Sequence, residues 1–229
     1  MRKRVIIFIA LVLFISCLPL SALDFLAAGG GLRITPYTER MSISSDNFLT
    51  ATVSYNWVDW GLYAFFDAKY VELNITYYRA LSGKYEQSNF GALLDLITEY
   101  GALDISYLDL ALMGKIPITT GPTGSIFLFG GFAYKFSLTS DYRYKYNSGD
   151  VPKEFWDQMW LKFGGSYDIP FNRRLFARTA FSVGFPIITK EWVDRRKIFE
   201  TLMAGSRGLD ISYFGIGAEL SAAIGYRIR

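Results

Sequence analysis

Polar and apolar residues alternate with a period of two along much of this chain, and this pattern constrains the fold more than any other feature. The segments Val71–Tyr77 and Ala218–Ile228 place apolar side chains on one face and polar side chains on the other. Successive side chains of a β-strand point to opposite faces, so the pattern predicts strands. After Ala22 no apolar run reaches the length of about 20 residues that a membrane-spanning helix needs.

The first 22 residues have the composition of a secretory signal peptide. A basic head at Arg2–Arg4 precedes the apolar segment Val5–Leu20, and small residues follow at Ser21 and Ala22. We expect cleavage after Ala22, which assigns residues 1–22 to the signal and residues 23–229 to one mature domain. A rival interpretation is a lipoprotein site in which Cys17 carries the lipid.

Composition limits the partners of the mature chain. Cleavage removes the only cysteine and leaves 21 of the 24 basic residues against 21 acidic ones. A near-neutral chain gives no reason to expect nucleic acid as a partner. Aromatic residues make up 17% of the sequence, which is typical of the aromatic girdles that flank a membrane. The core of a large aromatic β-sandwich is the alternative.

Alternation and turn residues together predict eight strands. They are expected at Phe25–Thr35, Leu49–Phe66, Lys69–Arg79, Leu103–Ile116, Ser125–Leu138, Gln158–Ile169, Leu175–Phe185 and Leu209–Arg229. Connections after the second, fourth and sixth strands are short, whereas the others are longer, at 36–48, 80–102, 139–157 and 186–208. Short turns alternating with long external loops are typical of outer-membrane barrels. The sequence therefore predicts an all-β fold, a closed antiparallel up-and-down transmembrane β-barrel, with ten strands as the alternative.

Irregular positions interrupt the alternation. Bulges are expected near Trp60 and, after a repeated Leu-Asp-Ile-Ser-Tyr sequence, near Tyr107 and Tyr213, because the parity of the apolar residues changes there. Apolar residues at helical spacing predict short helices in two external loops, at Phe90–Tyr100 and Lys190–Ala204.

Residue content argues against catalysis. The chain has no histidine, which removes the commonest general base and metal ligand, and the mature chain has no cysteine nucleophile. Gly29–Gly31 lacks the Lys-Ser/Thr pair and the following helix of a phosphate loop. We expect no enzyme activity, no cofactor and no metal.

If the apolar face meets lipid, the charges on the opposite face point into the barrel. These are Arg33, Glu72, Asp109, Lys115, Lys135, Lys162, Asp168, Arg178, Glu219 and Arg227. An eight-stranded barrel is just wide enough for its side chains to fill it, and unpaired buried charges are costly. We therefore expect a salt-bridged plug, with a narrow polar path for small solutes as the alternative.

One external loop combines tyrosine with basic residues. Its candidate binding residues for an anionic glycan or a host protein are Tyr142, Arg143, Tyr144, Lys145 and Tyr146. A strand extension above the membrane with tyrosine at the interface is the alternative.

The segment Tyr63–Glu72 and the terminal strand resemble the small eight-stranded outer-membrane barrel families, such as OmpW-like and OmpX-like proteins and the membrane domain of OmpA-like proteins. The resemblance covers nearly all of the mature chain and rests on pattern more than on a specific motif. Barrels of this kind often end in an aromatic residue, from which Arg229 departs.

This resemblance implies a non-enzymatic integral protein in the outer membrane of a diderm bacterium. Its partners would be outer-membrane lipid and the barrel assembly machinery, with a host or surface ligand as a further one. The implied role is envelope structure, surface interaction or passage of small solutes. The alternative is a periplasmic lipocalin-like barrel anchored at Cys17, whose apolar face would turn inward to a ligand.

Overall fold

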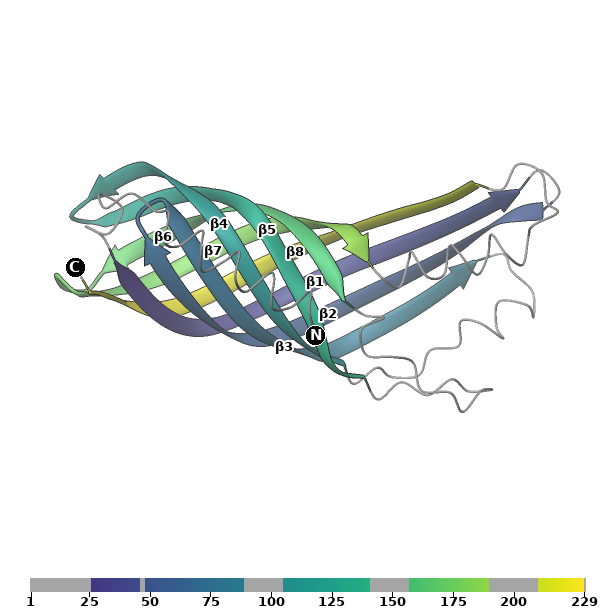
Figure 1. Ribbon diagram of the computed structural model, residues 1–229, viewed down its shortest axis with the longest axis horizontal. Helices are drawn as coiled ribbons and strands as arrows, with labels where there is room; N and C mark the ends of the chain where they lie inside the picture. Colours follow the sequence, from purple (N-terminus) through teal and green to yellow (C-terminus); the bar gives the residue numbers. More distant parts are fainter. Residues whose placement is uncertain (1–25, 46–47, 89–104, 141–156, 190–209, 229) are drawn as a thin grey trace, which may run out of the picture.

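The computed structural model describes residues 26–45, 48–88, 105–140, 157–189 and 210–228. These residues form eight strands: β1 Ala27–Ser45, β2 Phe48–Ala68, β3 Val71–Ser88, β4 Ile105–Gly121, β5 Gly124–Ser140, β6 Gln158–Pro170, β7 Leu175–Thr189 and β8 Asp210–Arg227. Each strand pairs antiparallel with its neighbours in sequence, and β8 pairs with β1 to close the barrel (Figure 1). The predicted eight-stranded closed barrel is confirmed, and the ten-stranded alternative is wrong.

The period-two alternation sorts side chains between the outside and the lumen. On β5, for example, Ile126, Leu128 and Phe132 are exposed on the outer face, whereas Phe127 between them and Ala133 beyond them are buried. The same alternation continues around the closed sheet, so each strand contributes an apolar stripe to the outside. No strand edge of the closed part is left open, because every strand there has two partners.

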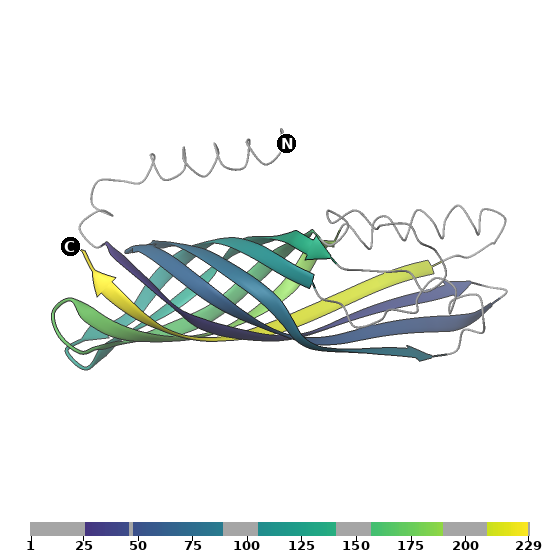
Figure 2. The same ribbon diagram turned by 90° about the horizontal axis from the view of Figure 1, so that it is seen from below.

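Three short turns lie at the same end of the barrel as the end of β8 (Figure 2). Lys69 in the β2–β3 turn adopts a positive φ of 55°. In the β6–β7 turn, the side-chain oxygen of Asn172 accepts hydrogen bonds from the backbone N–H groups of Arg174 and Leu175, at 2.8 and 2.7 Å. Such side-chain-to-backbone bonds stabilise tight turns. The β4–β5 turn is shorter than predicted, because β4 runs on to Gly121 and β5 begins at Gly124.

The first expected long loop, at 36–48, is largely strand, which corrects the prediction. β1 continues to Ser45 and pairs with β2, where Pro36 lies opposite Val58. Proline usually interrupts a sheet because it has no N–H to donate. The β1–β8 pairing skips Thr35 and Pro36, so the strand continues without that donor.

Four strands extend beyond the rest of the barrel. The β3–β4 pairing ends at Arg79, and the β7–β8 pairing ends at Gly217. Beyond these points β8, β1, β2 and β3 continue as an overhanging sheet, at the end opposite the short turns (Figures 1 and 2). Its outward-facing residues include the polar Arg40 and Asn56 together with the exposed apolar Leu81 and Phe214. Because a charge such as that of Arg40 is costly in hydrocarbon, we expect the overhang to lie outside the lipid.

The predicted bulges differ in their outcomes. A register shift lies at Ser106/Tyr107, but the extra residue, Leu138, belongs to β5 and not to β4, where the bulge was expected. The shift expected near Trp60 occurs at Val58/Asp59, but the extra residue, Leu81, belongs to β3. The bulge near Tyr213 is wrong, because β8 keeps one register with β1 through this position. Polar residues there need no bulge, since the overhang faces water on its outer side.

In the ranges that the structure describes, no helix has the length and apolarity to cross a membrane. The predicted loop helices at 90–100 and 190–204 lie outside the described residues, as do the signal segment 1–22 and Cys17.

Candidate functional site

Charged side chains fill the lumen. Nine of the ten residues predicted to point inward are buried, and Arg227 is half-buried near the short-turn end. Burial of an unpaired charge costs several kcal/mol, so the positions of the partners decide what the lumen can do. The charges form three groups along the barrel axis, which we call the lower, middle and upper networks.

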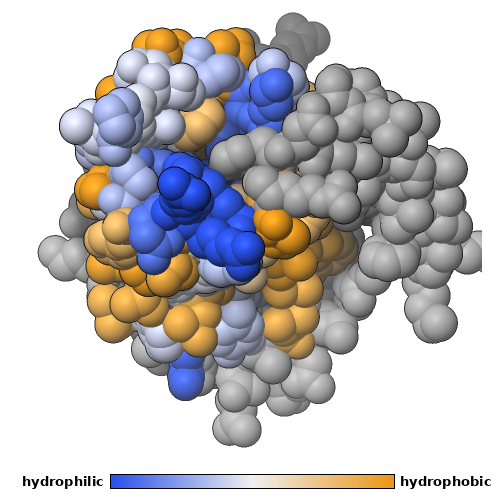
Figure 3. Space-filling model, turned by 90° about the vertical axis from the view of Figure 1, so that its left-hand side faces the viewer, coloured by the Kyte–Doolittle hydropathy of each residue, from blue (hydrophilic) through white to orange (hydrophobic). Residues whose placement is uncertain are grey.

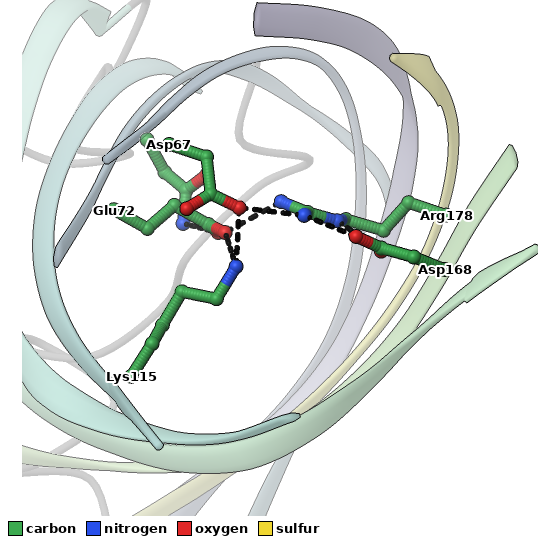
Figure 4. A network of polar contacts seen from close by, with 6 residues as sticks. Asp67, Glu72, Lys115, Asp168 and Arg178 are labelled. Atoms are coloured by element: carbon green, nitrogen blue, oxygen red, sulfur yellow. Dashed lines mark hydrogen bonds and ion pairs between the residues drawn. The ribbon is translucent and has the colours of Figure 1, made fainter. Parts of the chain in front are cut away.

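The lower network lies next to the short turns and centres on Arg178, which is 1% exposed (Figure 4). Its guanidinium holds Asp168 with two bonds, Nε–Oδ1 at 2.6 Å and Nη2–Oδ2 at 2.7 Å. It also donates to Glu72 Oε2 at 2.6 Å and to Asp67 Oδ2 at 2.7 Å. Lys115 is paired with the same two carboxylates, with 3.1 Å between its Nζ and Glu72 Oε2. Three carboxylates, from β2, β3 and β6, are thus tied together by two cations, from β4 and β7.

Aromatic rings enclose this network. The Arg178 guanidinium carbon lies 4.3 Å from the centroid of the Phe65 ring and 5.3 Å from that of Phe176. Phe65 and Phe176 pack together with a centroid distance of 6.2 Å. Rings at this distance exclude water and attract the cation through their negative faces. The lower network is therefore flanked by aromatic rings as well as paired.

The middle network balances two cations against two carboxylates. Lys162 Nζ lies 2.7 Å from Asp109 Oδ2 and 2.6 Å from Glu219 Oε1. Arg33 Nη1 approaches Glu219 Oε2 at 3.5 Å, and Tyr78 donates its hydroxyl to Glu219 Oε1 at 3.0 Å. Glu219 therefore joins β8 to three other strands.

The upper network is an aromatic cage around Lys135. Its Nζ lies 3.7 Å from Asp59 Oδ2, which is a long ion pair. Four ring centroids lie within 5.3 Å of the same Nζ, those of Tyr37, Tyr78, Tyr107 and Trp160. Such distances are within the range of cation–π attraction. The ammonium therefore lies within cation–π distance of four rings in addition to its carboxylate partner.

Sequence reasoning missed two carboxylates of these networks. Asp59 lies beside the bulge expected near Trp60, and Asp67 lies in the turn between the second and third predicted strands, so the pattern places neither in the lumen. The parity of Tyr63 and Phe65, which point inward, extends to both positions along β2. That uninterrupted parity was the signal that would have placed them in the lumen.

Between the lower and middle networks little free space remains. The cavity there has a volume of about 20 Å³. Its lining residues include Arg33, Glu72, Asn74, Lys162, Arg178 and Glu219. A volume of about 10–15 Å³ by this measure holds a single water molecule. The described lumen is therefore filled by its own side chains at this level.

The outer surface of the barrel decides between the membrane and the lipocalin interpretations. Among the most exposed residues are large apolar ones on different strands, such as Leu32, Leu62, Phe163 and Leu220. A soluble ligand-binding barrel would place such residues inside and charges outside. Here the charges are inside, so the lipocalin-like interpretation is wrong and the exterior fits lipid.

Two further predictions concern ligands. Among the described residues, no group of three or more histidine, cysteine or acidic residues is arranged to hold a metal ion. The candidate surface-binding residues Tyr142–Tyr146 lie outside the described residues, so their role stays a prediction.

Comparisons with known proteins concern the fold. No model of a protein family matches the chain, and no curated protein matches it by sequence. Among solved structures, OprG of Pseudomonas aeruginosa is 14% identical, with a TM-score of 0.49, over 90% of this chain and 96% of that one. Neisserial surface protein A is 8% identical, with a TM-score of 0.40 and coverage of 85% and 96%.

The outer membrane protease OmpT of Escherichia coli is also similar, with 8% identity, a TM-score of 0.43 and coverage of 90% and 97%. At these levels the likeness adds nothing to what the strand pairing itself establishes. By its own strand order and apolar exterior, the chain is a small eight-stranded transmembrane β-barrel, the architecture expected from the resemblance to small outer-membrane barrels.

Proposed function

We propose that this protein is a non-enzymatic integral barrel of the outer membrane of a diderm bacterium, with a structural role and a surface-display role. The filled lumen carries this proposal. Paired charges and a cavity of only about 20 Å³ favour a rigid anchor over a solute path. The overhanging sheet of β8, β1, β2 and β3 is what such an anchor would present beyond the bilayer.

Residues 1–22 support the proposed location, since a cleaved secretion signal is the entry route to the bacterial envelope. The apolar stripe on β8 supports insertion by the barrel assembly machinery. Its outward residues are Leu220, Ala222, Ile224, Tyr226 and Ile228. Recognition of this stripe would tolerate the departure at Arg229, because Tyr226 and Ile228 keep the alternation.

A non-enzymatic role is supported by the residues that the chain offers. It contains no histidine, so general-base hydrolysis of lipid or peptide by that residue is excluded. The buried lumen carboxylates are tied to cations, and their lumen leaves no room for a substrate larger than water at the cavity level.

Surface binding is the part of the proposal that concerns Tyr142–Tyr146. Alternating tyrosine and basic side chains suit an anionic glycan or a host protein. Deletion of this segment should abolish binding of cells to a sulfated glycan surface while leaving the amount of folded barrel unchanged. Undiminished binding would remove the segment from the proposal.

The experiment that tests the anchor role combines fractionation with conductance. Expressing cells are fractionated, and the membrane sample is compared unheated and boiled on a denaturing gel. We expect recovery in the outer membrane and a heat-dependent mobility shift, because a paired barrel resists detergent. The purified protein in planar lipid bilayers should give no conductance above that of protein-free lipid.

Glu219→Ala separates the anchor from a pore, with Leu220→Ala on the lipid-facing side of β8 as the matched control. In an anchor, Glu219→Ala lowers the free energy of unfolding much more than the control does, because Lys162 loses a partner. Stepwise conductance of the unaltered protein that Glu219→Ala changes without loss of stability would establish passage of solutes instead.

A further inference from the structure

Among the residues that the structure describes, the exposed charge at the short-turn end of the barrel has a single sign. All eight carboxylate side chains that the structure describes are buried. At this end Asp67, Glu72 and Asp168 point into the lumen and are paired with cations of the lower network. The charges that reach the outside there come from Lys69, Arg173, Arg174 and Arg227. We call these four residues the cationic rim.

The β6–β7 turn fixes Arg174 within this rim. Its backbone N–H donates to Asn172, and its carbonyl accepts a bond of 2.8 Å from the backbone N–H of Arg227. Its guanidinium donates from Nη1 to the hydroxyl of Tyr226 at 2.8 Å. One edge of the guanidinium is thereby held by tyrosine, and its other N–H groups are left to bind an anion.

The same pairing of a cation with an exposed tyrosine recurs across the rim. Lys69 Nζ lies 5.0 Å from the ring centroid of Tyr70 on the β2–β3 turn. Lys69 and Arg227 lie on neighbouring parts of the ring of strands, because Ala27 of β1 pairs with both Asp67 and Arg227. Tyrosines paired with cations are typical of the level of lipid headgroups.

Apolar side chains border the rim. Phe171 is 63% exposed beside Arg173, and Ile228 and Leu175 are exposed nearby. Figure 3 looks onto this end and shows a strongly hydrophilic patch bordered by hydrophobic residues. A soluble acidic polymer would bind the cations without using the apolar border. A lipid uses both, because its phosphate and its acyl chains lie next to each other.

We propose that the cationic rim binds the phosphate headgroup of an anionic phospholipid, such as phosphatidylglycerol, in the leaflet on the short-turn side. This inference rests on the proposed function, since it requires the barrel to be in a membrane. The lipid phosphate accepts from Arg173 and Arg174, and its acyl chains contact Phe171 and Leu175. Each basic residue near a membrane surface strengthens attraction to anionic lipid about fivefold.

Spin-labelled lipids test the proposal on the full-length barrel. The protein is folded into phosphatidylcholine vesicles, and electron spin resonance gives the association of labelled phosphatidylglycerol relative to labelled phosphatidylcholine. Arg173→Gln combined with Arg174→Gln should lower this ratio toward one. The matched control combines Arg40→Gln with Arg79→Gln, which removes two exposed cations remote from the short turns, and should leave the ratio unchanged.

Three outcomes would overturn the proposal. The first is a ratio of one for the unaltered protein, and the second is an equal fall in both double variants, which would show a general charge effect. The third is displacement of labelled phosphatidylglycerol by excess soluble glycerol phosphate, which would indicate a site for free phosphate. A heat-dependent mobility shift is measured on every sample to show whether the barrel is folded. A barrel that fails to insert would contradict the proposed function, whereas a folded barrel without lipid preference would contradict binding by the cationic rim.

Discussion

At the scale of single residues, Arg178 shows what a buried charge requires in this lumen. It contacts three carboxylates and lies against two aromatic rings, so its charge is neutralised and shielded from water. Lys115 shares two of the same carboxylates. With three carboxylates and two cations, the lower network has no cation to spare.

Arg178→Met should therefore be strongly destabilising. Within the described residues, the change leaves Asp168 without a cation and removes one of the two cations around Asp67 and Glu72. Breaking a buried pair in this way costs about 3–5 kcal/mol. Urea unfolding in lipid vesicles, followed by tryptophan fluorescence, measures the loss. Arg40→Met, at an exposed position, is the control, and a loss equal to that of the control would contradict a structural role for the network.

Lys135 offers a different test, because four aromatic rings surround its ammonium in addition to one carboxylate. Lys135→Met should lower the free energy of unfolding, since it leaves Asp59 buried without a cation. Lys135→Met combined with Asp59→Asn should recover part of that loss, because no charge is then left unpaired. A double-mutant cycle gives the coupling between the two residues. If the double variant is no more stable than Lys135→Met, the cage stabilises the lysine through its rings alone.

The alternation of residues along each strand predicts which side chains point into the lumen. Alternation placed Arg33, Glu72 and Glu219 in the lumen because their neighbours on each side are apolar or small. It gave no partner for any of them, since partners come from strands far apart in the sequence, as for Arg33 on β1 and Glu219 on β8. Only the closed strand order brings such residues together.

At the scale of strands, close approach between backbones sets the limits on side-chain size. A Cβ atom on Gly131 of β5 would lie 2.0 Å from the carbonyl oxygen of Leu112 on β4. Glycine at such a position lets two strands of a small barrel come close together. On the outer face, a Cβ on Gly114 would meet nothing nearer than 3.7 Å.

Gly131→Ala should accordingly impair the pairing of β4 with β5, whereas Gly114→Ala should be tolerated. Overpacking of this kind costs about 1–3 kcal/mol. The measurement is the fraction of protein that shows the heat-dependent mobility shift after folding into lipid vesicles, together with the urea midpoint. Equal folded fractions and equal urea midpoints for the two variants would mean that β4 and β5 can move apart without loss of stability.

The strand ends were the part of the fold that the sequence predicted least well. The first predicted strand ends at Thr35, yet β1 continues because Pro36 lies where pairing with β8 is interrupted. Trp57 is apolar but points inward and stacks on Tyr37, with 6.3 Å between the ring centroids. The outer face of the overhang mixes Arg40 and Asn56 with Leu81 and Phe214, so apolar residues do not mark the exterior there.

At the scale of the whole molecule, the barrel has three zones: the short turns, the apolar belt and the overhanging sheet. The belt places its residues in lipid, and the other two zones reach water on opposite sides of the membrane. Cys17 is the only cysteine of the chain. Single cysteines introduced into a Cys17→Ser variant can therefore report whether each zone is accessible from water.

A membrane-impermeant maleimide should distinguish these zones in intact cells. Asn56→Cys in the overhang should react directly, because it is exposed on the polar outer face. Thr123→Cys in the β4–β5 turn should react only after the outer membrane is permeabilised, and Leu62→Cys should stay unreactive in both cases because lipid covers it. Reaction of Thr123→Cys in intact cells, without reaction of Asn56→Cys, would show that the barrel has the opposite orientation in the membrane.

Closure of the strand ring also determines how the barrel resists a pulling force. β8 is bonded to β1 on one side and to β7 on the other, so drawing the chain out from the β8 end must break two ladders at once. Each strand removed after that has already lost one neighbour, and only one ladder holds it. Mechanical extraction therefore meets its highest barrier when β8, the first strand to leave, is removed. The pairing of β1 with β8 closes the barrel, and breaking it lowers the force needed for every later strand.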